Sequence, residues 1–290
     1  LQPEGPFLDD DNSTPTPPWS SVRELQHAAS QLELAEDNEK INKWLTILMA
    51  PGSSLGGARP KANILDDDKA LWIAKFPSKN DTLDKGAWEY LAYLLATDSG
   101  IDMAPCKIEK ITCNYHTFFT KRFDRVLGER IHFASAMTMT GNNEDTVRDS
   151  QSSYLDIADF IQNYGVDIDA NLAQLWRRIV FNIAISNTDD HLHNHGLVLT
   201  GKGWVLSPAY DLNPSVEKDG LALNIDMDSN DLDFDLARSV GAFFRLNEND
   251  MEVIIQEVLH GVGQWKALAK QIGISRSEQE MMSSAFRVHF

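Results

Sequence analysis

The chain has 290 residues, and its 26 basic and 43 acidic side chains give a formal net charge of −17. This length allows two lobes around separate cores, whereas so acidic a composition excludes a broad surface for nucleic-acid phosphates. The sequence shows no membrane-spanning apolar stretch and no secretory signal pattern. Cys106 and Cys113 fit neither a CxxC motif nor a disulfide framework, so we expect a cytoplasmic protein.

The amino-terminal part is predicted to combine helices with a small antiparallel sheet. Residues 1–19 are rich in Pro, Asp, Ser and Thr and are expected to form an exposed arm. Helical spacing of apolar residues and capping residues predict helices over 20–34, 38–49 and 82–98. Short apolar runs predict strands over 62–65, 70–76, 107–111 and 116–122.

A loop of small residues precedes the first of these strands. It runs from Pro51 to Lys61 and contains Gly52, Gly56 and Gly57, which would let backbone N–H groups approach a phosphate closely. The loop matches neither G-x-G-x-x-G nor G-x-x-x-x-G-K-[ST]. A flexible hairpin without a ligand is therefore the alternative interpretation.

Lys75 lies inside the apolar strand 70–76, where an unpaired ammonium group would be costly to bury. Glu89 on the helix 82–98 is a candidate partner, as in kinases, where a strand lysine paired with a helix glutamate contacts the ATP phosphates. The alternatives are a lysine at a sheet edge whose head group reaches solvent and an ordinary solvated glutamate.

The carboxyl-terminal part is predicted to be mainly helical from about Phe133 onward. Apolar residues recur at helical spacing, and Asn249 is the predicted cap of the third long helix. The helices are predicted over 154–164, 170–186, 249–261 and 263–272.

The segment that follows the second of these helices has the spacing of a kinase catalytic loop. Asp189 stands five residues before Asn194, and Asp211 follows a predicted hairpin of strands 196–199 and 204–206. In kinases such an Asp accepts the proton of the attacking hydroxyl, and the Asn and the second Asp bind Mg²⁺. The hairpin would return Asp211 to the side of Asn194, so that two oxygen donors could ligate one cation.

Two alternatives remain open for this segment. Its Asp and Asn residues could only cap turns. His191, His193 and His195 alternate beside Asp189 and Asp190 and could ligate a zinc or hydrolytic metal ion. No second cluster of His or Cys in the sequence completes such a site, so the magnesium interpretation is preferred.

Five segments in order resemble the HipA-type serine/threonine kinases of bacterial toxin–antitoxin systems. They are SSLGGARPK at 53–61, WIAKFP at 72–77, KRFDR at 121–125, NTDDHLHN at 187–194 and LSPAYDLNP at 206–214. The resemblance covers essentially the whole chain and implies an α+β, bilobal protein-kinase-like fold with a small β-rich N-lobe and a larger helical C-lobe. The implied divisions are an arm over 1–19, an N-lobe over 20–125 with the ATP lysine, and a C-lobe over 126–290 with the catalytic loop.

The resemblance also implies roles for individual residues. It matches the general base to Asp189 and the Mg²⁺ ligands to Asn194 and Asp211. Ser54, or less directly Ser53, matches the loop serine that the family autophosphorylates to switch itself off. The residues matched to ATP binding are Ser54, Lys61, Lys75 and Glu89 and, at the hinge, Lys121, Phe123 and Asp124.

By this resemblance the chain is expected to be an ATP-dependent protein serine/threonine kinase acting as a toxin. It would inhibit translation by phosphorylating an aminoacyl-tRNA synthetase or a similar target. The expected partners are a helix-turn-helix antitoxin that carries the DNA contacts and, unless the family's amino-terminal subdomain was removed from this chain, a separate small protein that supplies it. No direct contact with nucleic acid or membranes is expected. The alternatives are a catalytically silent ATP-binding co-repressor, against which the intact Asp189, Asn194, Asp211 and Lys75 argue, and a small-molecule kinase.

Overall fold

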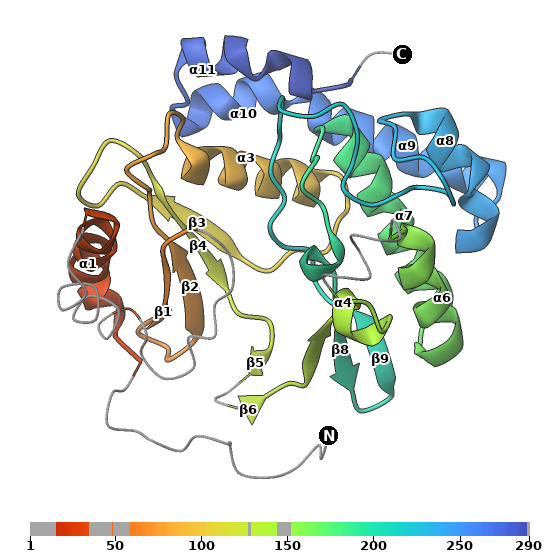
Figure 1. The fold of residues 1–290 in the computed structure, drawn as a ribbon, viewed down its shortest axis with the longest axis horizontal. Helices are drawn as coiled ribbons and strands as arrows, with labels where there is room; N and C mark the ends of the chain where they lie inside the picture. The colour runs from red at the N-terminus through yellow and green to blue at the C-terminus, as the bar shows by residue number, and fades with distance from the viewer. Residues whose placement is uncertain (1–15, 35–47, 49–58, 127–128, 144–151, 289–290) are drawn as a thin grey trace. The chain divides into compact units, whose positions relative to one another are not determined.

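The computed structural model describes residues 16–34, 48, 59–126, 129–143 and 152–288. The chain divides into two compact units (Figure 1). The first comprises the residues up to Tyr90 together with Pro105–Arg130, and the second comprises Leu91–Ala104 together with Ile131 onward. The segment 91–104 therefore belongs to the second unit, although the residues on both sides of it belong to the first.

The first unit is built on a four-stranded antiparallel sheet in the order β1-β2-β4-β3. Its strands are β1 (Lys61–Leu65), β2 (Leu71–Lys75), β3 (Cys106–Glu109) and β4 (Thr117–Lys121). At the turn between β1 and β2, the Asp66 carboxylate accepts hydrogen bonds from the backbone of Ala70 at 2.7 Å and the indole of Trp72 at 2.8 Å. The four predicted strands are thus confirmed, with β1 paired to β2 and β3 paired to β4. A second, two-stranded sheet pairs β5 (Arg125–Val126) with β6 (Glu129–Arg130).

Helix α1 (Val22–Leu34) follows a 3-10 turn at Trp19–Ser21 and packs beside the four-stranded sheet (Figure 1). Its buried apolar residues recur three and four positions apart, which places them on one face of the helix. They share one core with residues of the sheet, namely Val22, Leu25, Ala28 and Ala29 with Ala62, Ile64, Ala74 and Phe119. The helix predicted over 38–49 lies outside the described residues except for Leu48.

Helix α3 (Lys85–Asp98) begins beside Asp84, whose carboxylate accepts a hydrogen bond from the backbone of Ala87 at 3.2 Å. The same carboxylate accepts from the backbone of His116 at 2.9 Å and lies 2.6 Å from its Nδ1. A methyl group on Gly86 would lie 2.2 Å from the carbonyl oxygen of His116. Glycine at this position therefore allows the chain before β4 to reach the helix.

The second unit contains a three-stranded antiparallel sheet in the order β7-β8-β9 and most of the helices. The strands are β7 (Phe133–Ser135), β8 (Gly196–Thr200) and β9 (Gly203–Leu206). The helices are α4 (Ala136–Met139), α6 (Tyr154–Tyr164), α7 (Ile168–Ala184), α8 (Phe234–Ser239), α9 (Glu248–Gly263), α10 (Trp265–Ile272) and α11 (Arg276–Met281). The predicted start of helical structure at about Phe133 is wrong, because Phe133–Ser135 pairs with β8.

Helix α7 is the centre of this unit and packs against α6, α8 and α9 (Figure 1). Its apolar side chains Trp176, Ile179, Val180 and Ile183 have no exposed surface, which explains the strong helical periodicity of this segment. Among the described residues, no helix has both the length and the apolar composition needed to cross a membrane.

The predicted cap of α9 is wrong by two residues. The helix starts at Glu248, and Asn247 is its N-cap. The Asn247 side chain accepts a hydrogen bond from the backbone of Asp250 at 3.0 Å, and the Asp250 carboxylate accepts one from the backbone of Asn247 at 3.2 Å. This reciprocal capping box satisfies two backbone donors at the helix start, whereas Asn249 lies inside the first turn.

Candidate functional site

The predicted catalytic loop lies in the second unit, between the end of α7 and the start of β8. Asp189 is exposed, whereas Asn194, at the end of the 3-10 turn Leu192–Asn194, is 8% exposed. The Asn194 Nδ2 donates a hydrogen bond to the carbonyl oxygen of Asp189 at 3.0 Å. This bond closes the loop and leaves the amide oxygen of Asn194 as the group that can ligate a cation.

Strands β8 and β9 form the predicted hairpin, in which Thr200 pairs with Gly203 next to the turn. Near the open end of the hairpin, the hydroxyl of Tyr210 donates to the carbonyl of His193 at 2.7 Å. Tyr210 directly precedes Asp211, and His193 directly precedes Asn194. The two predicted Mg²⁺ ligands therefore have neighbours that are hydrogen-bonded to each other.

Asp211 has a left-handed backbone conformation, with a φ of 59°. For a residue other than glycine this conformation costs roughly 1–2 kcal/mol, although Asp and Asn tolerate it better than most residues. Its Oδ1 accepts a hydrogen bond from Asn213 Nδ2 at 3.4 Å. Such backbone strain persists only where the surrounding structure imposes it, and it is concentrated at functional sites.

The donor chemistry of Asn194 and Asp211 fits Mg²⁺. An amide oxygen and a carboxylate are hard ligands, and Mg²⁺ usually takes one or two carboxylates and completes its shell with phosphates and water. Across the parts of the chain that the structure describes, no three His, Cys, Asp or Glu side chains are grouped to hold a metal ion. Of the three alternating histidines, His195 contacts the buried Asp190.

Asp190 is buried, whereas the neighbouring Asp189 is exposed. Asp190 is 0% exposed, and its Oδ2 accepts hydrogen bonds from Tyr154 Oη at 2.5 Å, Asn182 Nδ2 at 2.7 Å and His195 Nε2 at 2.8 Å. Burial raises the pKa of Tyr154, and the charge of Asp190 raises it further, so the hydroxyl stays protonated as a donor. Sequence reasoning missed this cluster. The available signal was that Tyr154 and Asn182 are polar residues on the apolar faces of two predicted helices.

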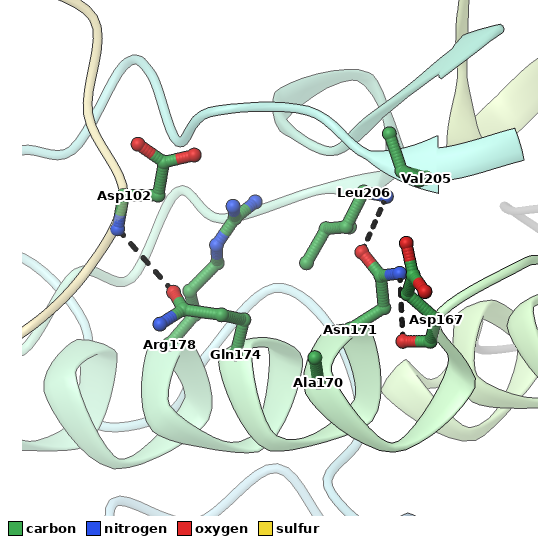
Figure 2. A pocket seen from close by; sticks show the side chains of 8 residues that line it. All are labelled: Asp102, Asp167, Ala170, Asn171, Gln174, Arg178, Val205 and Leu206. Atoms are coloured by element: carbon green, nitrogen blue, oxygen red, sulfur yellow. Dashed lines mark hydrogen bonds between the residues drawn. The ribbon is translucent and has the colours of Figure 1, made fainter. Parts of the chain in front are cut away.

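A cavity of about 260 Å³ lies along one face of α7. Figure 2 shows that two amide side chains on this face tie other segments to the helix. Asn171 Oδ1 accepts from the backbone of Leu206 at 2.8 Å, and Gln174 Oε1 accepts from the backbone of Asp102 at 3.3 Å.

Arg178 also lines this cavity (Figure 2) and is buried, with 2% of its surface exposed. Its Nη2 donates to the carbonyl of Ser207 at 2.5 Å, and this bond fixes the start of the segment that leads to Asp211. Burial lowers the pKa of Arg178 to about 10, while the carboxylates of Asp190 and Asp102 act in the opposite direction. The side chain therefore keeps its positive charge at neutral pH.

The segment that follows α3 is anchored to the same elements. Arg177 donates to the carbonyl of Ser99 at 2.8 Å, and the backbone of Ala209 donates to the carbonyl of Asp102 at 2.8 Å. Met103 forms an isolated parallel bridge with Ala209. Residues 99–103 thus hold the backbone two residues before Asp211, an arrangement that sequence reasoning did not predict.

The first unit contains the predicted ATP lysine and its partner. Lys75 Nζ lies 2.5 Å from Glu89 Oε1, which confirms the predicted pair. Lys61 is directly opposite Lys75 in the β1–β2 register, so both side chains project from one face of the sheet. Two cationic groups on one face would repel each other without a carboxylate, and Glu89 supplies that carboxylate.

The other predicted ATP-binding residues follow or end β4. Lys121 and Phe123 are half-buried, and Asp124 is buried. The Asp124 carboxylate lies 2.6 Å from both the Arg122 and the Arg125 guanidinium groups. Burial would raise the pKa of Asp124, but hydrogen bonds and the charges of these arginines lower it. A nucleotide contact by these residues stays a prediction, and Ser53 and Ser54 lie outside the described residues.

Solved structures that resemble the chain include two of named proteins. One contains HipA, HipB and operator DNA of the toxin–antitoxin system of Shewanella oneidensis MR-1, and its matching chain is 19% identical, with a TM-score of 0.61. The match covers 86% of this chain and 68% of that one. The other is the Helicobacter pylori proinflammatory kinase CtkA, which is 15% identical, with a TM-score of 0.60 over 81% of this chain and 89% of that one. At these identities the likeness shows a shared fold, and it confirms the predicted α+β, kinase-like class.

No curated protein matches the chain. A family model matches most of it, however, in a range that spans β1, Lys75, the catalytic loop and Asp211. Because the HipA-like C-terminal domain model covers residues 53–266, which is more than half of the 290 residues, the chain belongs to the HipA-like C-terminal domain family.

Proposed function

We propose that this protein transfers the γ-phosphoryl group of Mg-ATP to a serine or threonine hydroxyl of another protein. The observation that carries the proposal is the closed loop between Asp189 and Asn194, which presents an exposed carboxylate and a free amide oxygen. Asp211 is linked to this loop through the Tyr210–His193 hydrogen bond. Membership of the HipA-like family and the fold shared with a named kinase support the same reaction class.

Each residue then has a defined task. Asp189 would accept the proton of the acceptor hydroxyl as its oxygen bonds to the γ-phosphorus, while the bond from that phosphorus to the β-phosphate oxygen breaks and ADP leaves. Asn194 and Asp211 would hold Mg²⁺, which would supply positive charge to offset that of the ATP phosphates. Lys75, oriented by Glu89 at 2.5 Å, contacts the phosphates, and Lys61 adds a second positive charge on the same face of the sheet.

The physiological role that we propose is that of a toxin. The structure named for HipA also contains HipB and operator DNA, which supports a helix-turn-helix antitoxin as the partner of this chain. By family resemblance, the target is an aminoacyl-tRNA synthetase or a similar protein, and phosphorylation of Ser54 or Ser53 switches the enzyme off. A phosphoserine there would add roughly −1.5 to −2 charges to the loop and weaken ATP binding.

The test compares wild type with Asp189→Asn and Asp211→Ala. Asp189→Asn is expected to lower phosphoryl transfer about 10²–10⁴-fold without weakening ATP binding, because its carboxylate acts on the acceptor. Asp211→Ala should weaken Mg-ATP binding as well. Mass mapping of phosphate after incubation with Mg-ATP measures transfer, and calorimetry measures nucleotide affinity.

Each remaining outcome selects another function. ATP binding by wild type without transfer would identify a silent partner of an antitoxin. Transfer confined to sugars or amines would identify a small-molecule kinase. Near-normal transfer by Asp189→Asn would show that another group is the base.

A further inference from the structure

We propose that Asp190 and His195 form a clamp that sets the separation between Asp189 and Asn194. The clamp deepens the proposed function and rests on it, because it positions the base and a Mg²⁺ ligand without touching substrate or metal. Asp190 and His195 are therefore positioning residues, whereas Asp189 and Asn194 act on the reacting groups.

The four residues form two adjacent pairs in the sequence. Asp190 directly follows Asp189, and His195 directly follows Asn194. The bond from His195 Nε2 to Asp190 Oδ2 is 2.8 Å long, and the bond from Asn194 Nδ2 to the Asp189 carbonyl is 3.0 Å long. Two successive cross-links thus close the same loop, one between Asn194 and Asp189 and one between the buried Asp190 and His195.

The buried cross-link is attached to the helices of the second unit. Asp190 Oδ2 also accepts hydrogen bonds from Tyr154 on α6 and from Asn182 on α7. Asn182 in turn accepts a hydrogen bond from Asn187 Nδ2 at 3.0 Å through its Oδ1. The loop is therefore fixed to two packed helices, and low surrounding polarity strengthens each of these hydrogen bonds.

The cost of burying Asp190 and His195 indicates that the clamp positions the loop residues rather than stabilises the fold. Asp190 is 0% exposed and His195 is 2% exposed, and taking such groups out of water costs free energy that their attraction only partly offsets. Well-packed apolar residues often stabilise a core equally well or better. A misplacement of about 1 Å, in contrast, can cost 10²-fold in catalytic rate. The separation of Asp189 and Asn194 is the property that a polar cross-link here controls.

The experiment uses two substitutions of His195. His195→Phe removes the Nε2 donor but keeps an aromatic ring. The ring stays beside Tyr154, since the ring centroids of His195 and Tyr154 lie 5.6 Å apart. His195→Gln keeps an N–H donor at a similar reach. We expect His195→Phe to lower kcat about 10–100-fold and to raise the Mg²⁺ concentration for half-maximal rate. His195→Gln should recover most of the wild-type kcat.

Trp176→Phe is the matched control. It removes a buried hydrogen bond on α7, from Trp176 Nε1 to the carbonyl of Ala237 at 3.0 Å, without touching the loop. It should lower Tm and leave kcat within about twofold of wild type, since its partner is remote from the loop in sequence. If His195→Phe does not fold, His195→Leu replaces it as the variant without a donor.

A wild-type kcat in His195→Phe, with a loss of Tm like that of the control, would overturn the proposal. If wild type itself transfers no phosphate, the proposed function fails. The clamp is then tested by the affinity of the protein for a metal ion and a nucleotide. The probe is then Mn²⁺ with a non-hydrolysable ATP analogue. Weaker Mn²⁺ binding in His195→Phe that His195→Gln restores supports the clamp, and equal binding in all variants overturns it.

Discussion

Three buried aspartates show how this acidic chain keeps carboxylates inside its cores. Asp84 and Asp124 are each 7% exposed and Asp190 is 0% exposed, and each accepts several hydrogen bonds from neighbouring residues. For Asp84 and Asp124, these donors outweigh burial and lower the pKa. Hydrogen bonds rather than exposure to water therefore stabilise the charge at these positions.

Asp84 provides a test of this account through pH. Burial would raise its pKa, but the hydrogen bonds from His116 and Ala87 and the charge of His116 lower it. Because the folded pKa lies below the unfolded one, the ionised carboxylate stabilises the fold above about pH 4. This contribution disappears as pH falls through the folded pKa. Asp84→Asn should therefore be less stable than wild type by roughly 1–3 kcal/mol at pH 7.

The difference should shrink progressively as the pH falls below about 4, as measured by urea unfolding of both proteins at several pH values. A difference that stayed constant from neutral to acidic pH would show that the charge of Asp84 does not contribute.

At the scale of elements, local patterns predicted the long helices and the hairpins. Helix α6 has the predicted bounds Tyr154–Tyr164, because a helical apolar stripe and a capping box at Ser153 mark its start. Strand β7 could not be predicted, since its three residues acquire strand geometry only by pairing with β8. Helix α8, of six residues, is too short to show a period.

The candidate site, like the fold, was predictable in its local part only. The spacing of Asp189, Asn194 and the hairpin before Asp211 predicted which residues would share the loop, and their roles stay predictions. Polar residues on apolar helix faces gave a signal for Tyr154 and Asn182, but their meeting at Asp190 was not predictable, because α6, α7 and the loop must pack together before three donors meet one oxygen. A sequence reader sees two adjacent aspartates and cannot tell which one will be buried.

The start of α9 offers a matched pair of substitutions. Asn247→Ala removes the side chain that accepts from the Asp250 backbone and should lower the free energy of unfolding by about 1 kcal/mol. Asn249→Ala lies two residues further along on the exposed surface. Because alanine has the higher helix propensity, this control should be neutral or slightly stabilising. Equal losses in both variants, measured by urea unfolding, would contradict the capping box.

At the scale of the whole molecule, the net charge of −17 governs contact with nucleic acid. Binding to duplex DNA depends on cations that replace counterions along the phosphates. The isolated chain should therefore show negligible affinity for DNA at physiological salt, and binding should appear only with an added basic antitoxin. Mobility shifts over a series of salt concentrations measure this. Tight, strongly salt-dependent binding by the chain alone would contradict it.

The division of the chain into units also affects how it folds on the ribosome. Residues 91–104 belong to the second unit, and they bond to α7 and Ala209, which are synthesised much later. At about 5–20 residues per second, synthesis of residues 105–184 takes roughly 4–16 s. During that time Leu91 and Leu95, which are 0% exposed in the finished protein, lack the rest of the second unit, which begins at Ile131. The sheet of the first unit can form as soon as β4 has emerged. The second half of α3 must wait for the later residues of the second unit. Until then the nascent chain exposes an apolar helix face that a chaperone can bind.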